Sequence, residues 1–141
     1  VNGPKAAALN NTLVVAWFTG AEENPRVQLL FSDDNGEHFD VPILIATGNV
    51  LGRVDVDLID SETAVVSWME SKDKTTSFKV AKVSKSGALI KMRTVTTMDG
   101  SRKSGFPQME LLGDTIYFAW TDYSKSGSHV QTAKLAIEDF K

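Results

Sequence analysis

A four-residue apolar pattern that ends in tryptophan occurs three times in this chain. It reads Val-Val-Ala-Trp at 14–17, Val-Val-Ser-Trp at 65–68 and Tyr-Phe-Ala-Trp at 117–120. These copies contain all three tryptophans of the sequence, spaced 51 and 52 residues apart (17 to 68 and 68 to 120). A fixed period of roughly 40–50 residues marks an array of repeated structural units. The chain therefore contains three copies of one unit.

Short strands fill each unit. Runs rich in Val, Ile, Thr and aromatic residues alternate with Gly, Asn, Asp and Ser, and no stretch keeps an apolar period of 3.6. We therefore expect almost no helix. The expected strands are 5–10, 12–19, 26–32 and 41–47 in the first unit, 53–59, 63–71, 77–84 and 91–97 in the second, and 106–112, 115–122 and 129–137 in the third.

A repeat of this length with four short strands predicts the blade of a β-propeller. The predicted fold is all-β: one partial domain of three four-stranded antiparallel blades (units 2–49, 51–100 and 104–141), the last without its fourth strand. The tryptophans are expected to wedge between blades. Three blades do not close a ring, so we expect the remaining blades to come from another chain or from a second copy of this one.

Composition and net charge limit the kinds of partner that we expect for this chain. Hydrophobic residues make up 42% and charged residues 23%, as in ordinary globular domains. A net charge of −3 gives no reason to expect nucleic acid or an anionic membrane, and no apolar run is long enough to span a bilayer. Without cysteine there is no disulfide or Cys-ligated metal. His38 and His129 have no partner pattern, so we expect neither metal nor cofactor. The start at Val1, without a signal peptide, predicts a processed or excised piece.

One motif falls between the third and fourth expected strands of the first unit. The run Ser-Asp-Asp-Asn-Gly-Glu-His-Phe at 32–39 resembles the Asp box of sialidase-type propellers, Ser-x-Asp-x-Gly-x-Thr-Trp. Ser32, Asp34 and Gly36 match in place, whereas Phe39 replaces the tryptophan and His38 the threonine. The motif also has the position in the repeat that it takes in that family.

These residue types suit a tight turn. Asp34 can accept backbone N–H bonds within the turn, and Gly36 can adopt a positive φ. Ser32 adds a hydroxyl to the same network, and Phe39 is expected to plug the blade. We therefore predict a structural role for the motif.

The whole chain is similar to the C-terminal half of bacterial sialidase-like proteins, through segments 24–27, 51–55 and 104–107. That family usually has six blades. The resemblance implies a glycoside hydrolase-like or glycan-binding protein for acidic sugars such as sialic acid, located in the periplasm or outside the cell. A propeller of this kind that serves only as a protein- or carbohydrate-binding scaffold is the alternative.

The resemblance also implies where a site would lie. The Asp box marks the end away from substrate, so the starts of the first strands and the loops after the second strands surround the site. A retaining sialidase holds the substrate carboxylate with arginines and uses a tyrosine nucleophile assisted by a carboxylate. This implies Arg53 and Arg102 as carboxylate contacts, and Tyr123 with the neighbouring Asp122 as catalytic residues.

A plainer interpretation of the same residues stays open. Arg53 alternates with Asp55 and Asp57, and this pattern also fits a polar strand face with satisfied ion pairs. Arg102 also fits a solvated charge in a loop, and Tyr123 an ordinary loop aromatic.

Overall fold

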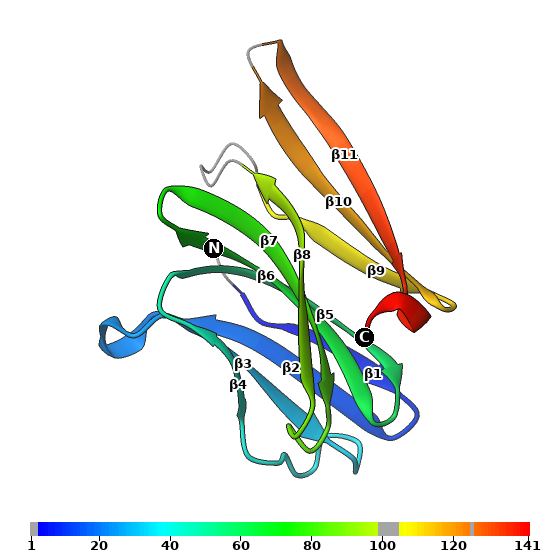
Figure 1. Ribbon diagram of the computed structural model, residues 1–141. Coiled ribbons are helices and arrows are strands. Elements are labelled where there is room, and N and C mark those ends of the chain that lie inside the picture. Colours follow the sequence, from blue (N-terminus) through cyan, green and yellow to red (C-terminus); the bar gives the residue numbers. More distant parts are fainter. Residues whose placement is uncertain (1–2, 99–104, 125) are drawn as a thin grey trace.

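The structure, a computed structural model, describes residues 3–98, 105–124 and 126–141. These residues form three antiparallel sheets, each made of strands that are consecutive in the chain (Figure 1). The first sheet contains β1 (Lys5–Leu9), β2 (Thr12–Thr19), β3 (Arg26–Ser32) and β4 (Ile43–Thr47). The second contains β5 (Val50–Asp60), β6 (Thr63–Lys72), β7 (Thr75–Ser84) and β8 (Ile90–Met98). The third contains β9 (Gln108–Leu112), β10 (Thr115–Ser124) and β11 (Gly127–Ala136).

The all-β prediction is confirmed. Among the described residues, helix is limited to two short 3₁₀ segments, η1 (Ala21–Glu23) and η3 (Ile137–Asp139). Neither is long and apolar enough to cross a membrane. The order of neighbours within each sheet follows the chain, as expected for a meander, and the third sheet has three strands.

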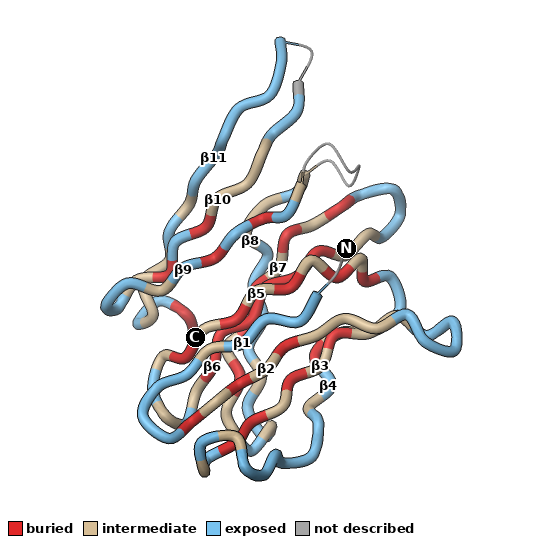
Figure 2. Tube along the Cα trace, turned by 180° about the vertical axis from the view of Figure 1, so that it is seen from behind, coloured by how far each residue is buried: buried red, intermediate tan, exposed pale blue. Residues whose placement is uncertain are grey.

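The sheets stack face against face, and the buried residues lie between them (Figure 2). One hydrophobic cluster joins the first and second sheets, with Phe31 and Trp68 among its fully buried members. A second cluster joins the second and third sheets, where Phe78 meets Phe118 edge to face at a centroid distance of 5.6 Å. Strands of the second sheet are covered on both faces, which explains why β6 is buried without interruption over 64–69.

The tryptophans occupy three different environments. Trp68 is fully buried between the first two sheets, and its indole N–H donates to Glu70 Oε1 at 2.8 Å. Trp120 contacts Phe78 edge to face at 6.2 Å, between the second and third sheets. Trp17 is only half-buried. The predicted wedge is therefore confirmed for Trp68 and Trp120.

Asp55 and Asp57 link the second sheet to the third. Asp55 accepts from the backbone N–H of Val56 at 2.9 Å and from that of Met109 at 3.0 Å. Asp57 accepts from Leu58 and Leu111 N–H, both at 3.1 Å. These two carboxylates therefore accept from backbone N–H groups of β5 and β9, the first strands of two neighbouring sheets. The interpretation of this strand face as a plain polar surface had expected ion pairs with Arg53 instead.

Candidate functional site

The starts of the three first strands enclose one hollow. Its volume is about 280 Å³, and it lies where β1, β5 and β9 begin. The turns β1–β2 and β3–β4 lie together at the other end of the first sheet, where Asn35 N–H donates to the Asn11 carbonyl at 3.1 Å. The residues that line the hollow, called the axial pocket below, are Gly3, Pro4, Lys5, Arg53, Val54, Phe106, Pro107 and Gln108.

A β-bulge places Arg53 in the axial pocket. Gly52 and Arg53 both have positive φ, 84° and 55°, and the register between β5 and β6 shifts between Gly52 and Asp55. Positive φ is uncommon for a residue with a side chain, and bulges re-aim side chains beside functional sites. The local backbone therefore departs from a regular strand at the position that the sequence singled out.

The guanidinium of Arg53 is held from several sides. It lies over the Phe106 ring, 5.5 Å from the centroid, and Nη1 donates to the Gly105 carbonyl at 2.9 Å. Nη1 also lies 3.5 Å from the Met69 sulfur. A cation–π contact and a hydrogen bond fix the position of a planar, permanently charged group.

The rest of the pocket adds a second positive charge and a neutral amide. Lys5 is exposed, and the Gln108 side-chain N–H donates to the Phe106 carbonyl at 3.0 Å. No carboxylate is among the described residues that line the pocket. Two cations, an aromatic ring and an amide form a site suited to a small anion that also has an apolar surface.

Three of the four predicted ligand-site residues lie in the described part of the chain, and of these three the axial pocket contains Arg53 alone. Arg102 lies outside the described residues. Asp122 and Tyr123 lie on β10, paired with His129 and Ser128 of β11, and are not among the residues that line the pocket. Because neighbouring residues of a strand face opposite sides of the sheet, Asp122 and Tyr123 do not face each other here.

Sequence reasoning had not selected Lys5, Phe106 or Gln108. Each lies near the start of a first strand, as Arg53 does. Comparing the equivalent positions of the three units could therefore have identified them. The cation–π contact depends on the approach of two units and has no signature in the local sequence.

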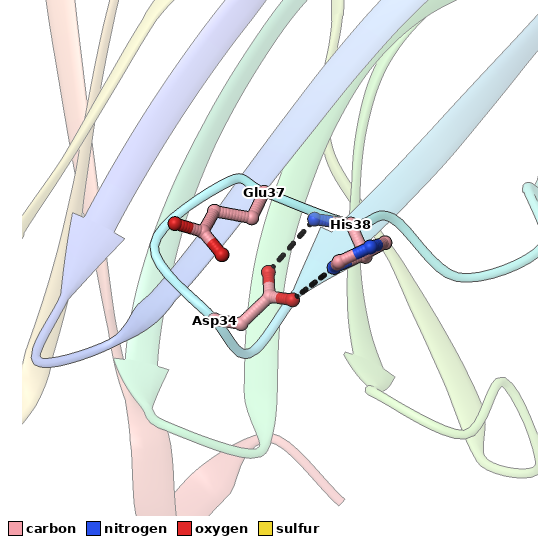
Figure 3. A group of neighbouring side chains, drawn as sticks. All are labelled: Asp34, Glu37 and His38. Atoms are coloured by element: carbon pink, nitrogen blue, oxygen red, sulfur yellow. Dashed lines mark hydrogen bonds and ion pairs between the residues drawn. The ribbon is translucent and has the colours of Figure 1, made fainter.

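The predicted turn at 32–39 has the hydrogen bonds expected of it. Figure 3 shows the contacts between His38 and Asp34. Asp34 Oδ1 accepts from Ser32 Oγ at 2.8 Å and from His38 N–H at 2.9 Å. Ser32 Oγ accepts from Gly36 N–H at 2.9 Å, and Gly36 has a φ of 84°. Phe39 is 42% exposed, so the expectation that it plugs the blade was wrong.

His38 does have a partner, contrary to our expectation. Its Nδ1 lies 2.7 Å from Asp34 Oδ2, and ligand atoms of Asp34, Glu37 and His38 all lie within 4.8 Å of one another. The Asp34 carboxylate is already engaged in the hydrogen bonds of the turn. The group is therefore explained as a turn network on the exposed surface, because both Asp34 oxygens accept bonds there.

The network makes the turn sensitive to acid. Hydrogen bonds from His38 and Ser32 lower the pKa of Asp34 from 3.8 to about 2. Because the folded pKa is lower than the unfolded one, the ionised carboxylate stabilises the fold above about pH 4 and loses this effect as the pH falls toward 2. We expect Asp34→Asn to be less stable than wild type at pH 6 and to approach it at pH 2, as measured by urea unfolding.

Asp40→Asn is the matched control, because Asp40 closes the same turn through its backbone N–H bond to the Phe31 carbonyl. We expect it to follow the wild-type pH dependence. An Asp34→Asn variant whose stability deficit stays constant from pH 6 to 2 would contradict this account of the turn.

Comparison with known proteins shows the fold. No protein-family model matches the chain, and no curated protein matches its sequence. The solved structure of Hadza microbial sialidase Hz136 is similar over 94% of this chain, with a TM-score of 0.55 and 16% sequence identity. The matched region is 31% of that protein's chain. At this identity the likeness shows a sialidase-like β fold and leaves the activity to be inferred from the site.

Proposed function

We propose that the chain provides consecutive blades of a sialidase-like β-propeller and binds an acidic glycan of the sialic acid type at the axial pocket. The observation that carries the proposal is Arg53, which a bulge places in that pocket against the Phe106 ring. Arginine matches a carboxylate with two hydrogen bonds, and an aromatic ring offers an apolar surface to a sugar. Arg102 is the proposed second carboxylate contact, and a periplasmic or extracellular location is proposed with the family.

The arrangement of the sheets supports this position for a ligand. In a propeller the first strands surround a central channel, and the axial pocket lies at the start of β1, β5 and β9. The 32–39 turn is then an Asp box at the opposite end, where it stabilises the first blade without contacting the glycan.

Calorimetric titration with sialyllactose tests the proposal. We expect Arg53→Ala to weaken binding roughly 10- to 100-fold, because hydrogen bonds from a charged group are worth about 1.5–3 kcal/mol. Arg93→Ala is the matched control. Arg93 also lies over a ring, 5.8 Å from the Phe140 centroid, and Nη2 donates to the Lys141 carbonyl at 3.0 Å, but it does not line the axial pocket.

Two results would contradict the proposal. One is wild-type affinity in Arg53→Ala, and the other is equally tight binding of lactose, which has the same neutral sugars without the carboxylate.

A non-catalytic glycan-binding scaffold is the second candidate function. Asp122 and Tyr123 occupy adjacent positions of β10 and face opposite sides of the third sheet, which favours binding over hydrolysis. A fluorogenic sialoside separates the two functions. The scaffold predicts no hydrolysis by the chain with binding intact. Hydrolysis that Tyr123→Phe abolishes would instead support the proposed catalytic residues.

A further inference from the structure

Each sheet has a front face, toward the next sheet along the chain, and a back face. Val14 and Ala16 of the first sheet face forward, because they share a cluster with Ala64, Val66 and Trp68 of the second. The front of the second sheet likewise meets the back of the third, where Val65 and Phe78 lie with Ile116 and Phe118. Front-to-back contact is therefore the rule at both sheet interfaces of the described chain.

Two faces are left without a described sheet against them. Alternation along the strands assigns Leu13, Val15, Trp17 and Leu44 to the back of the first sheet, where Leu44 is 50% exposed. The same rule assigns Glu110, Tyr117, Ala119 and Val130 to the front of the third sheet, where Val130 is 74% exposed. On this front lies a hollow of about 300 Å³, lined by Gln108, Glu110, Tyr117, Ala119 and Thr132 among others.

The front of the third sheet has acceptor side chains at the same positions as the front of the second sheet. Asp57 lies opposite Val65, and Val65 is three positions before the tryptophan of its unit. The Asp57 carboxylate accepts from Leu111 N–H of the next sheet at 3.1 Å. Glu110 lies opposite Tyr117, also three positions before its tryptophan. Gln108, which lies opposite Ala119, has the position in the third sheet that Asp55 has in the second. The third sheet thus repeats the acceptor pair of the second.

The back of the first sheet has the matching donors. Met109 and Leu111, whose N–H groups are the donors at the existing interface, lie opposite Phe118 and Ile116. Ala6 and Ala8 have the equivalent places in β1, opposite Val15 and Leu13. Their N–H groups therefore lie on the edge of β1 away from β2.

We propose that the front of the third sheet binds the back of the first sheet of a second copy of this chain. Glu110 and the Gln108 amide oxygen accept from the N–H groups of Ala8 and Ala6, while Tyr117 meets the side of the sheet that carries Val15. A second copy is the chosen occupant because one chain supplies both halves of the donor–acceptor set. This inference rests on the proposed function, since it treats the sheets as propeller blades; two copies would then close one ring through two such contacts.

Sedimentation velocity without glycan tests the contact, so a failure here is distinct from a failure of glycan binding. We expect a dimer at 100 µM, weakened about tenfold or more by Glu110→Lys, which sets a donor against a donor. Val15→Lys on the back face is expected to do the same. Glu138→Lys, an identical charge change at an exposed position of η3, should leave the dimer intact. Thermal melting followed by circular dichroism checks that each variant is folded.

Mixing the variants distinguishes this contact from other pairings. Glu110→Lys has an intact back face and Val15→Lys an intact front face, so the mixture should regain dimers through one wild-type interface. Dimers retained by Val15→Lys alone would indicate a front-to-front pair and overturn the proposal. So would a folded wild-type monomer at 100 µM, the result expected if blades of a longer chain cover these faces.

Discussion

Trp68→Ala is expected to lower the free energy of unfolding by about 3–5 kcal/mol, the usual cost of deleting a large buried aromatic side chain. Trp68 is fully buried between the first and second sheets, and its deletion also leaves Glu70 without the indole N–H at 2.8 Å. Since domains of this size have about 5–15 kcal/mol of stability in total, the variant should be partly unfolded at 37 °C. Urea unfolding followed by circular dichroism measures the loss.

Phe39→Ala is the comparison that gives this result its meaning. Phe39 is 42% exposed, so its deletion should cost less than half as much. Equal losses would contradict the assignment of Trp68 to an inter-sheet wedge and would restore the predicted plug role of Phe39.

Asp57→Ala is expected to loosen the third sheet from the second. The carboxylate accepts from Leu58 and Leu111 N–H, both at 3.1 Å, and each donor left unpaired in a partly buried place costs about 1–3 kcal/mol. Hydrogen exchange by NMR should show lost protection in β9–β11 with β1–β4 little changed. Asp60→Ala is the matched control, because Asp60 accepts from Glu62 N–H within its own turn at 2.8 Å. Uniform loss of protection over all three sheets would contradict a local link.

The repeat predicted the strands well because strand pattern and turn chemistry are local properties. The period of the tryptophans placed β2, β6 and β10 correctly, and the turn after Ser32 formed the predicted hydrogen bonds. Errors arose at strand ends, where the β10–β11 hairpin pairs further toward its turn than expected. β10 runs to Ser124, whereas 122 was the predicted end, so Tyr123 lies within the strand and faces away from Asp122.

The candidate site was predicted only in part. The sequence placed Arg53 at the start of a first strand. The bulge at Gly52 appears only in the pairing of β5 with β6, and the Phe106 ring that Arg53 contacts comes from the third unit. The roles of Asp55 and Asp57 were likewise not predictable locally, because their partners Met109 and Leu111 lie in another sheet. Alternation identifies a polar face and gives no information about what that face contacts.

NMR titration of the isotope-labelled chain with sialyllactose, and with lactose as the neutral control, tests the central claim most directly. The account predicts that sialyllactose shifts the signals of Lys5, Arg53, Phe106 and Gln108, which line the axial pocket, and that lactose shifts them far less. Shifts confined to residues outside this pocket, or equal shifts with both sugars, would contradict an acidic glycan site at the start of the first strands.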